Sequence, residues 1–386
     1  MRQYFDLVDL NDIMVGAHLY ASGGGCALEN GQQLINQIIK LYPKDAVKVP
    51  LISPKDIKSD EYVAVSAAMG APQSFLELGF GKSPVRAFQA HQSSMVRLLK
   101  DPTFKFSGIV PVETGVMAHS MCLLVAAILD IPIVDGDGGG RAFPLLQMAT
   151  FARPIEHHPI PVSPAILCSE EDIAQQGTTI SFEQNEASTV DKLTRAIISC
   201  NVGFKNRASL SCFAMDGAAL RVPGRLVWNT LTRAKTVGSA LRQAIAQKSK
   251  PVDTVLSLTH GVKLFEGELH DVANATMGGF DTLTITLKRG KDAVVIVAKN
   301  ENMLVWSNDR SAPLAMAPDI IAYMTPEGQV LGNSEITELF KKGQRPMVSL
   351  LGIPADKEII NDYFIQQFQS VFQQHGYYGA YVPLKA

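Results

Sequence analysis

The residues best suited to chemistry lie in one glycine-rich stretch, IPIVDGDGGGRAFP (residues 131–144). An apolar run ends at Asp135 and Asp137, and Arg141 follows three further glycines. Glycine allows tight turns and a close approach to a ligand, and ligand sites in open α/β sheets lie beyond the carboxyl ends of strands. Two carboxylates and a guanidinium there predict a site that handles charge. The alternative is a structural turn, in which the aspartates cap backbone amides and Arg141 is their ion-pair partner.

Two more candidates lie on the chain segment that leads into this stretch. The run FSGIVPVETG (106–115) predicts a strand ending near Glu113, and the apolar residues 116–130 predict a helix. A strand, a helix and a second strand form a β-α-β unit, whose strands are parallel neighbours. Glu113 is therefore expected at the same sheet edge as the two aspartates. His119, in the first helical turn, is expected to face that edge or the core.

A second glycine-rich loop, SGGGC (22–26), lies between two predicted helices. Such a loop before a helix offers free backbone N–H groups to an anion, so Gly23, Gly24, Gly25 and Cys26 are candidate substrate-binding residues. A flexible hinge is the alternative. The loop is not a dinucleotide fingerprint, because no strand precedes it and the glycine spacing differs. Cys26 is an alternative nucleophile, since a thiol in such a loop can have a lowered pKa.

The composition favours an ordinary globular protein. The 386 residues are 46% hydrophobic and 19% charged, which suits two or three domains. The net charge of −2 gives no electrostatic footprint for nucleic acid. No basic leader is evident and no apolar run approaches about 18 residues, so neither secretion nor a membrane span is expected. Five cysteines without a C-x-x-C pair argue against a disulfide framework and predict a reduced, cytoplasmic protein.

The pattern along the chain predicts two domains. Residues 1–165 are expected to form an α/β domain with a largely parallel sheet that carries both glycine-rich loops. A rise in proline and then charge over 160–172 is interpreted as the junction. Residues 166–386 are expected to form a β-rich domain, a sandwich or barrel with flanking helices. The reason is a series of short alternating runs and turns from residue 253 onward. The apolar content also favours a homo-oligomer.

Together these motifs resemble the S-methyl-thiohydantoin desulfurase-like family, long catalogued as a domain of unknown function. The resemblance rests on the order of the glycine loop, VPVETG (110–115) and IPIVDGDGGGRAFPLLQMATF (131–151), and covers essentially the whole chain. Two departures fall in the expected site: residues 26–28 replace a polar residue and proline, and residues 115–119 replace a glycine pair and asparagine. The fold is therefore expected to hold while the substrate differs.

The resemblance implies hydrolysis at a five-membered cyclic imide-like ring, which needs an activated water and a stabilised oxyanion. Asp135 or Asp137 would position water or a divalent metal such as zinc or manganese. Glu113 or His119 would carry the proton, while the glycine loop and Arg141 would orient a small-molecule substrate. No nucleotide cofactor is expected.

The alternative function is a non-catalytic ligand-binding or regulatory subunit. The resemblance makes this plausible, because relatives occur fused to hydantoinase/oxoprolinase-type polypeptides, so a partner of that type is conceivable. An acid/base pair converging in a carboxylate-lined pocket would discriminate between the two functions, because a binding module needs none.

Overall fold

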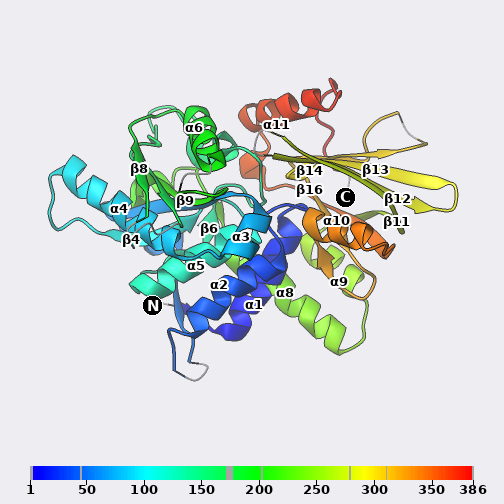
Figure 1. Ribbon diagram of the computed structural model, residues 1–386, viewed down its shortest axis with the longest axis horizontal. Helices are drawn as coiled ribbons and strands as arrows, with labels where there is room; N and C mark the ends of the chain where they lie inside the picture. The colour runs from blue at the N-terminus through cyan, green and yellow to red at the C-terminus, as the bar shows by residue number, and fades with distance from the viewer. Residues whose placement is uncertain are drawn as a thin grey trace.

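The structure is a computed structural model that describes residues 3–43, 46–170, 177–200, 203–277, 280–309 and 311–384. Two large sheets lie side by side, each with helices packed against it (Figure 1). The predicted α/β domain followed by a β-rich domain is confirmed at this level.

The first sheet is mixed and largely parallel, in the order β1-β2-β5-β4-β3-β9-β7-β8. Its parallel centre consists of β2 (Val49–Ile52), β5 (Ile133–Val134), β4 (Phe106–Pro111) and β3 (Tyr62–Gly70). Antiparallel pairing adds β1 (Gln3–Phe5), β9 (Arg207–Asp216), β7 (Ala165–Ser169) and β8 (Thr179–Phe182). The central strands are buried and apolar because helices cover both faces.

The first sheet extends beyond the predicted boundary at residue 165. That boundary coincides with the start of β7, and the strands of this sheet continue to Asp216, within the range assigned to the second domain. Within this range, Pro161 and Pro164 precede the fully buried strand β7. The last two residues of that range lie outside the described part of the chain.

Helices enclose the first sheet, with α6 above it and α1, α2 and α5 below it in Figure 1. Their bounds are α1 (Leu7–Tyr20), α2 (Leu28–Ile39), α3 (Pro72–Leu78), α4 (Lys82–Leu99), α5 (Val116–Leu129), α6 (Ala187–Ser199), α7 (Gly217–Leu220) and α8 (Thr230–Ala246). Helix α5 is apolar on all sides because it packs against α1, α2, α4 and the sheet at once. A two-stranded ribbon, β6 (Gly136–Asp137) with β10 (Val227–Trp228), follows β5.

The second sheet is entirely antiparallel, in the order β15-β14-β13-β12-β11-β18-β16-β17. Its strands are β11 (Val262–Met277), β12 (Phe280–Arg289), β13 (Asp292–Lys299), β14 (Glu301–Ser307), β15 (Ala315–Met316), β16 (Ile320–Met324), β17 (Val330–Leu331) and β18 (Met347–Ile353). Helices α9 (Pro251–Thr259), α10 (Asn333–Lys341) and α11 (Asp362–Gln374) accompany it. A finer arrangement as a sandwich or barrel stays a prediction.

Helix α9 occupies part of a segment that the sequence analysis assigned to strands, and that assignment is wrong. The β-branched residues of this segment suggested a strand. The buried residues Val252, Val255 and Thr259, however, are three and four positions apart, which is the spacing of a helix face.

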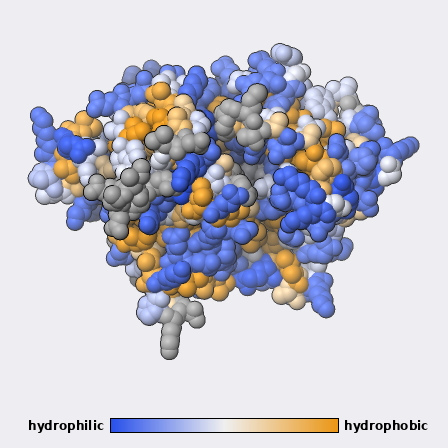
Figure 2. All heavy atoms as spheres, viewed as in Figure 1, coloured by the Kyte–Doolittle hydropathy of each residue, from blue (hydrophilic) through white to orange (hydrophobic). Residues whose placement is uncertain are grey.

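Polar and apolar residues are intermixed on the surface. On the face in Figure 2, hydrophobic residues form several separate areas divided by hydrophilic ones. In the described residues, no helix is long and apolar enough to cross a bilayer. The homo-oligomer stays a prediction.

A buried carboxylate closes the N-terminus of α4. Glu170 is 8% exposed and accepts hydrogen bonds from the amides of Gly81 (3.1 Å), Lys82 (3.2 Å) and Ser83 (2.8 Å). Replacing Glu170 with Ala leaves these donors unpaired and is expected to lower the free energy of unfolding by roughly 1–3 kcal/mol in urea titrations. The exposed Glu327→Ala is the control. Equal stability of the two variants would contradict this role.

Candidate active site

Asp137 lies just beyond the carboxyl end of β5 and is fully buried. Its Oδ1 accepts hydrogen bonds from the amides of Gly139 (2.9 Å) and Gly140 (2.7 Å). Its Oδ2 accepts the hydroxyl of Thr114 at 2.5 Å. The sheet edge therefore brings the loop after β4 and the loop after β5 together, as predicted from the β-α-β unit. Through these hydrogen bonds, the Asp137 carboxylate holds both loops in place.

His119 also reaches Asp137, with Nε2 3.2 Å from Oδ2 and both side chains fully buried. Burial disfavours an ionised carboxylate, but the bonds from His119, Thr114 and Gly140 outweigh it and lower the pKa of Asp137. A buried carboxylate with several donors and a low pKa is a stable anion. These contacts hold the two loops together, and the catalytic role of Asp137 and His119 stays a prediction.

Both carboxylate oxygens of Asp135 accept hydrogen bonds from the first turn of α8. Its Oδ1 accepts the amide of Thr232 at 3.1 Å and its Oδ2 accepts the Thr232 hydroxyl at 2.5 Å. Its backbone carbonyl accepts the amide of Asn229 at 2.9 Å. Asp135 thus ties the helix N-terminus to the sheet edge, which is the capping alternative considered for this loop.

The aspartates do not fit the divalent metal that the sequence analysis considered. Asp135 and Asp137 both have hydrogen-bond donors on each carboxylate oxygen. Over the described ranges, no group of three or more His, Cys, Asp and Glu side chains is arranged to hold a metal ion.

Arg141 joins the two domains through backbone carbonyls. The guanidinium is 1% exposed and donates to Ala142 (2.8 Å), Pro318 (2.9 Å), Asp319 (2.9 Å) and Asn302 (3.3 Å). Burial lowers its pKa to about 10, against the effect of nearby carboxylates, so it stays charged at neutral pH. These hydrogen bonds cross-link the two domains. The role of Arg141 in substrate binding stays a prediction.

The glycine loop is held between α5 and the second domain. The carbonyl of Gly25 accepts the amide of Met117 at 3.1 Å, and the carbonyl of Gly23 accepts the amide of Asn333 at 2.7 Å. The Gly24 amide donates to the carbonyl of Ala21 at 3.0 Å. Gly23 and Gly25 have φ angles of 82° and 68°, a region that favours glycine. The amides of Gly24 and Gly25 are engaged within the protein, so neither is an open anion site.

Glu301, at the start of β14, reaches this loop from the second domain, and the sequence analysis did not identify it. The side chain is 4% exposed, and a Cβ at Gly24 would lie 2.2 Å from its Oε1, so a larger residue at Gly24 would have to displace the Glu301 side chain. The amide of Gly25 donates to the carboxylate. Glu301 Oε2 is buried and has no hydrogen-bond partner within the described structure.

Glu113 and Glu301 form an electrostatically coupled pair of carboxyl groups. Glu113 is partly exposed, and its Oε2 accepts the amide of Phe143 at 2.9 Å. Burial and the charge of Glu301 raise the pKa of Glu113 well above its usual value. Burial also raises the pKa of Glu301 to about 7, although Arg141 and Arg195 act to lower it. Because the two carboxyl groups are coupled, ionisation of one opposes ionisation of the other.

Cys26 lies beside this pair in a left-handed backbone conformation, with φ 71°. Burial raises the pKa of its thiol, and the charges of Glu113, Glu301 and Glu335 raise it further. Glu335 is itself paired with His18, at 3.3 Å. A protonated thiol is a poor nucleophile, so the environment argues against Cys26 as the nucleophile.

The candidate active site therefore differs in part from the predicted one. The structure brings together three of the predicted elements, namely the glycine loop, Cys26 and Glu113, and adds Glu301. Asp137 instead accepts backbone amides of its own loop, and Asp135 accepts an amide at the start of α8. Arg141 donates to backbone carbonyls of the second domain.

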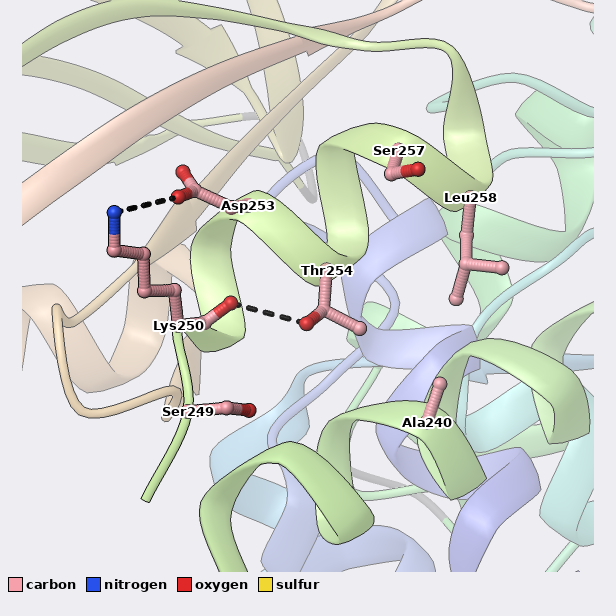
Figure 3. Close-up of a pocket in the computed structure, with 7 residues that line it drawn as sticks. All are labelled: Ala240, Ser249, Lys250, Asp253, Thr254, Ser257 and Leu258. Carbon is pink, nitrogen blue, oxygen red and sulfur yellow. Dashed lines mark hydrogen bonds and ion pairs between the residues drawn. The ribbon is translucent and has the colours of Figure 1, made fainter. Parts of the chain in front are cut away.

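Two surface hollows lie elsewhere. One, of about 490 Å³, lies between α8 and α9, where Lys250 points toward Asp253 at 3.7 Å and Thr254 donates to the Lys250 carbonyl at 3.0 Å (Figure 3). The other, of about 600 Å³, is lined by residues 227–228 and 355–358. In the first, the Lys250–Asp253 ion pair is exposed, and the Thr254 hydrogen bond lies at the start of α9. The coupled glutamates are therefore the stronger candidate site.

Comparison with known proteins matches both domains to one family. The model described as "S-Me-THD-like, N-terminal domain" matches residues 8–178, and "S-Me-THD-like, C-terminal domain" matches residues 184–362. A crystal structure of a protein from Chromobacterium violaceum has 26% sequence identity and a TM-score of 0.80, covering 99% of this chain and 100% of that one. No curated protein matches the chain.

Proposed function

The chain belongs to the S-Me-THD-like family, and from this premise we propose that it is a hydrolase of five-membered cyclic imide-like rings of the thiohydantoin or hydantoin type. The observation that supports catalysis is the coupled pair Glu113 and Glu301, in which burial raises both pKa values. A carboxyl group with a pKa near the working pH serves as a general acid or base. A binding or regulatory subunit needs no such pair.

In the proposed reaction, the ionised carboxylate of the pair takes a proton from water as the water oxygen attacks the ring carbon. The protonated partner donates a hydrogen bond to the developing oxyanion, which a neutral carboxyl group in a buried site can do. The same proton then passes to the leaving sulfur or nitrogen as its bond to carbon breaks. The pair thus supplies one base and one acid.

Asp137 and His119 support the pair indirectly in this proposal. Asp137 binds the hydroxyl of Thr114, the residue next to Glu113, and the amides of Gly139 and Gly140. Their role is to position Glu113 beside the glycine loop. A hydantoinase-type partner stays a prediction.

The test is an assay of the full-length protein with S-methyl-thiohydantoin and with hydantoin, following thiol release and ring opening. The rate should rise as pH increases toward about 7, because one carboxyl group of the pair must be ionised. It should fall again where the pair loses its second proton, which gives a bell-shaped profile. No turnover of either ring would overturn the proposal. Loss of activity on treatment with a chelator would support the divalent metal that the sequence analysis considered.

Replacing Cys26 with Ser is expected to change the rate less than about fivefold, because a protonated thiol contributes little nucleophilicity. Serine keeps the size of the side chain in the left-handed conformation at this position. The rate constants of the variant and the parent protein are compared at pH 7. A loss of more than a hundredfold in a folded variant would restore Cys26 as the nucleophile.

A further inference from the structure

The side chain of Arg195, on α6, binds the segment that supplies a hydrogen-bond donor to the paired glutamates. Its Nη2 donates to the carbonyl of Pro144 at 2.7 Å. The preceding residue, Phe143, donates its amide to Glu113 Oε2 at 2.9 Å. Arg195 is therefore one residue away in the chain from a donor to Glu113.

Asp191, one helical turn earlier, fixes the orientation of this guanidinium. Arg195 donates from Nε to Asp191 Oδ2 at 2.8 Å and from Nη2 to Oδ1 at 3.3 Å. Oδ1 also accepts the amide of Leu146 at 3.3 Å. Asp191 is buried, and Arg195 is largely so. A guanidinium held at two points by a carboxylate has a defined direction, so α6 holds residues 144–146 in place.

The second domain meets Arg195 at the aromatic ring of Phe280. The guanidinium carbon of Arg195 lies 4.2 Å from the ring centre, and Nζ of Lys299 lies 4.4 Å from the same centre. Lys299 is the direct partner of Glu301 in the β13–β14 ladder. The ring thus connects α6 to the strand end that carries Glu301.

The charge of Arg195 also acts on Glu301 itself. The charged groups around Glu301 include Glu113, Arg141 and Arg195. Burial raises the pKa of Glu301, whereas Arg141 and then Arg195 act to lower it. Arg195 therefore influences both carboxyl groups of the pair, one through a backbone segment and the other through its charge.

We propose that Arg195 is a positioning residue of this site, which fixes the Phe143 amide against Glu113 and holds a positive charge near the strand end that carries Glu301. This inference rests on the proposed function and names a residue that acts through the pair. Arginine can serve in both ways because its guanidinium is always charged and donates in several fixed directions at once. Lysine supplies the charge without that geometry, so Arg195→Lys separates the two contributions.

Titration of the Glu301 carboxyl group tests the charge contribution and needs no turnover. The group is followed by ¹³C NMR of protein labelled at glutamate Cδ, and its signal is assigned by its loss in Glu301→Gln. In Arg195→Gln the midpoint should rise from about 7 by about one pH unit, because a cation that favours the ionised form is gone. In Arg195→Lys it should stay close to that of the parent protein.

Arg242 provides a matched control for the loss of an ion pair. Its guanidinium also binds a carboxylate at two points, with Nε and Nη2 each 2.8 Å from the oxygens of Asp12, and joins α8 to α1. Arg242→Gln removes a comparable interaction elsewhere in the first domain. It should leave the titration midpoint, kcat and the pH profile of the rate unchanged.

Rates measured with hydantoin test the positional contribution. In Arg195→Lys, kcat should fall roughly tenfold while KM changes less than about threefold, because one ammonium cannot reproduce the fork that binds Asp191 and Pro144. Arg195→Gln should combine a lower kcat with an ascending limb of the pH profile displaced to higher pH.

An unchanged midpoint in Arg195→Gln, or an equal shift in Arg242→Gln, would overturn the inference. If Arg195→Gln hydrolyses hydantoin with the rate and pH profile of the parent protein, the proposed function stands and the inference fails. If the midpoint moves as expected but the parent protein hydrolyses no ring, the hydrolase proposal fails and the action of Arg195 on Glu301 stands.

Discussion

Replacing Glu301 with Gln is expected to lower kcat/KM by roughly 10²–10⁴-fold while making the folded protein more stable at pH 8. The loss of activity follows from removal of one member of an acid/base pair. The gain in stability follows because the wild-type protein must hold a charge in a buried site, and glutamine carries none. Few structural residues combine these two effects, whereas catalytic residues in strained or desolvated sites often do.

The sign of the stability effect can be worked out from the pKa of Glu301, which is about 7 in the folded protein against 4.5 ordinarily. Between these pH values the folded state holds more protons, so the contribution to stability is full below about 4.5 and is lost as pH rises to about 7. One pKa unit corresponds to about 1.4 kcal/mol, so the difference at pH 8 is on the order of 3 kcal/mol.

Urea unfolding of wild type and Glu301→Gln at pH 4 and pH 8 measures this effect. The variant should be more stable than wild type at pH 8 and not at pH 4. The exposed Glu327→Gln should behave as wild type at both. A Glu301→Gln variant with normal activity would remove Glu301 from the reaction. A variant that is less stable at pH 8 would show that its carboxylate is needed for the fold.

Replacing Arg141 with Met is expected to cost on the order of 4 kcal/mol of unfolding free energy. The change leaves four backbone carbonyls without their donor, and each lost bond to a charged group in the interior costs about 1–3 kcal/mol. Part of the loss is recovered because the methionine side chain fills apolar space beside Phe368, whose ring lies 5.4 Å from the guanidinium carbon.

Arg345 offers a matched control for this measurement. It also donates to two backbone carbonyls, those of Phe340 and Gln344, but it is exposed. Arg345→Met should therefore cost less than about 1 kcal/mol in the same titration. If Arg141→Met is as stable as wild type and loses only affinity for substrate, the predicted substrate-binding role of Arg141 is correct and the cross-link is secondary.

The sequence predicted the elements that lie close together along the chain. The apolar runs on either side of helix α5 identified the β-α-β unit, and parallel crossovers then required Glu113 and Asp137 to share a sheet edge. The Thr114–Asp137 hydrogen bond shows that the two loops meet. The capping alternative for the aspartates was also available from the sequence, because aspartate commonly accepts backbone amides in turns.

Contacts between the two domains could not be predicted in the same way. Glu301 follows Asn300 at a hairpin turn, where a charged residue is usually exposed. Only the packing of β14 against the glycine loop buries it and raises its pKa. The carbonyl partners of Arg141 on residues 302–319 depend on the same packing. An acidic residue two positions before the apolar run MLVW (303–306) was the available clue.

The late position of β9 in the chain has a consequence for synthesis of the protein on the ribosome. Strand β3 ends at Gly70, but its neighbour β9 begins at Arg207, so one edge of the central sheet stays unpaired until more than 130 further residues have emerged. An unpaired edge of apolar strand can pair with another nascent chain. Fragments that stop at residue 165 keep that edge open and should aggregate, whereas fragments that reach Asp216 should remain soluble.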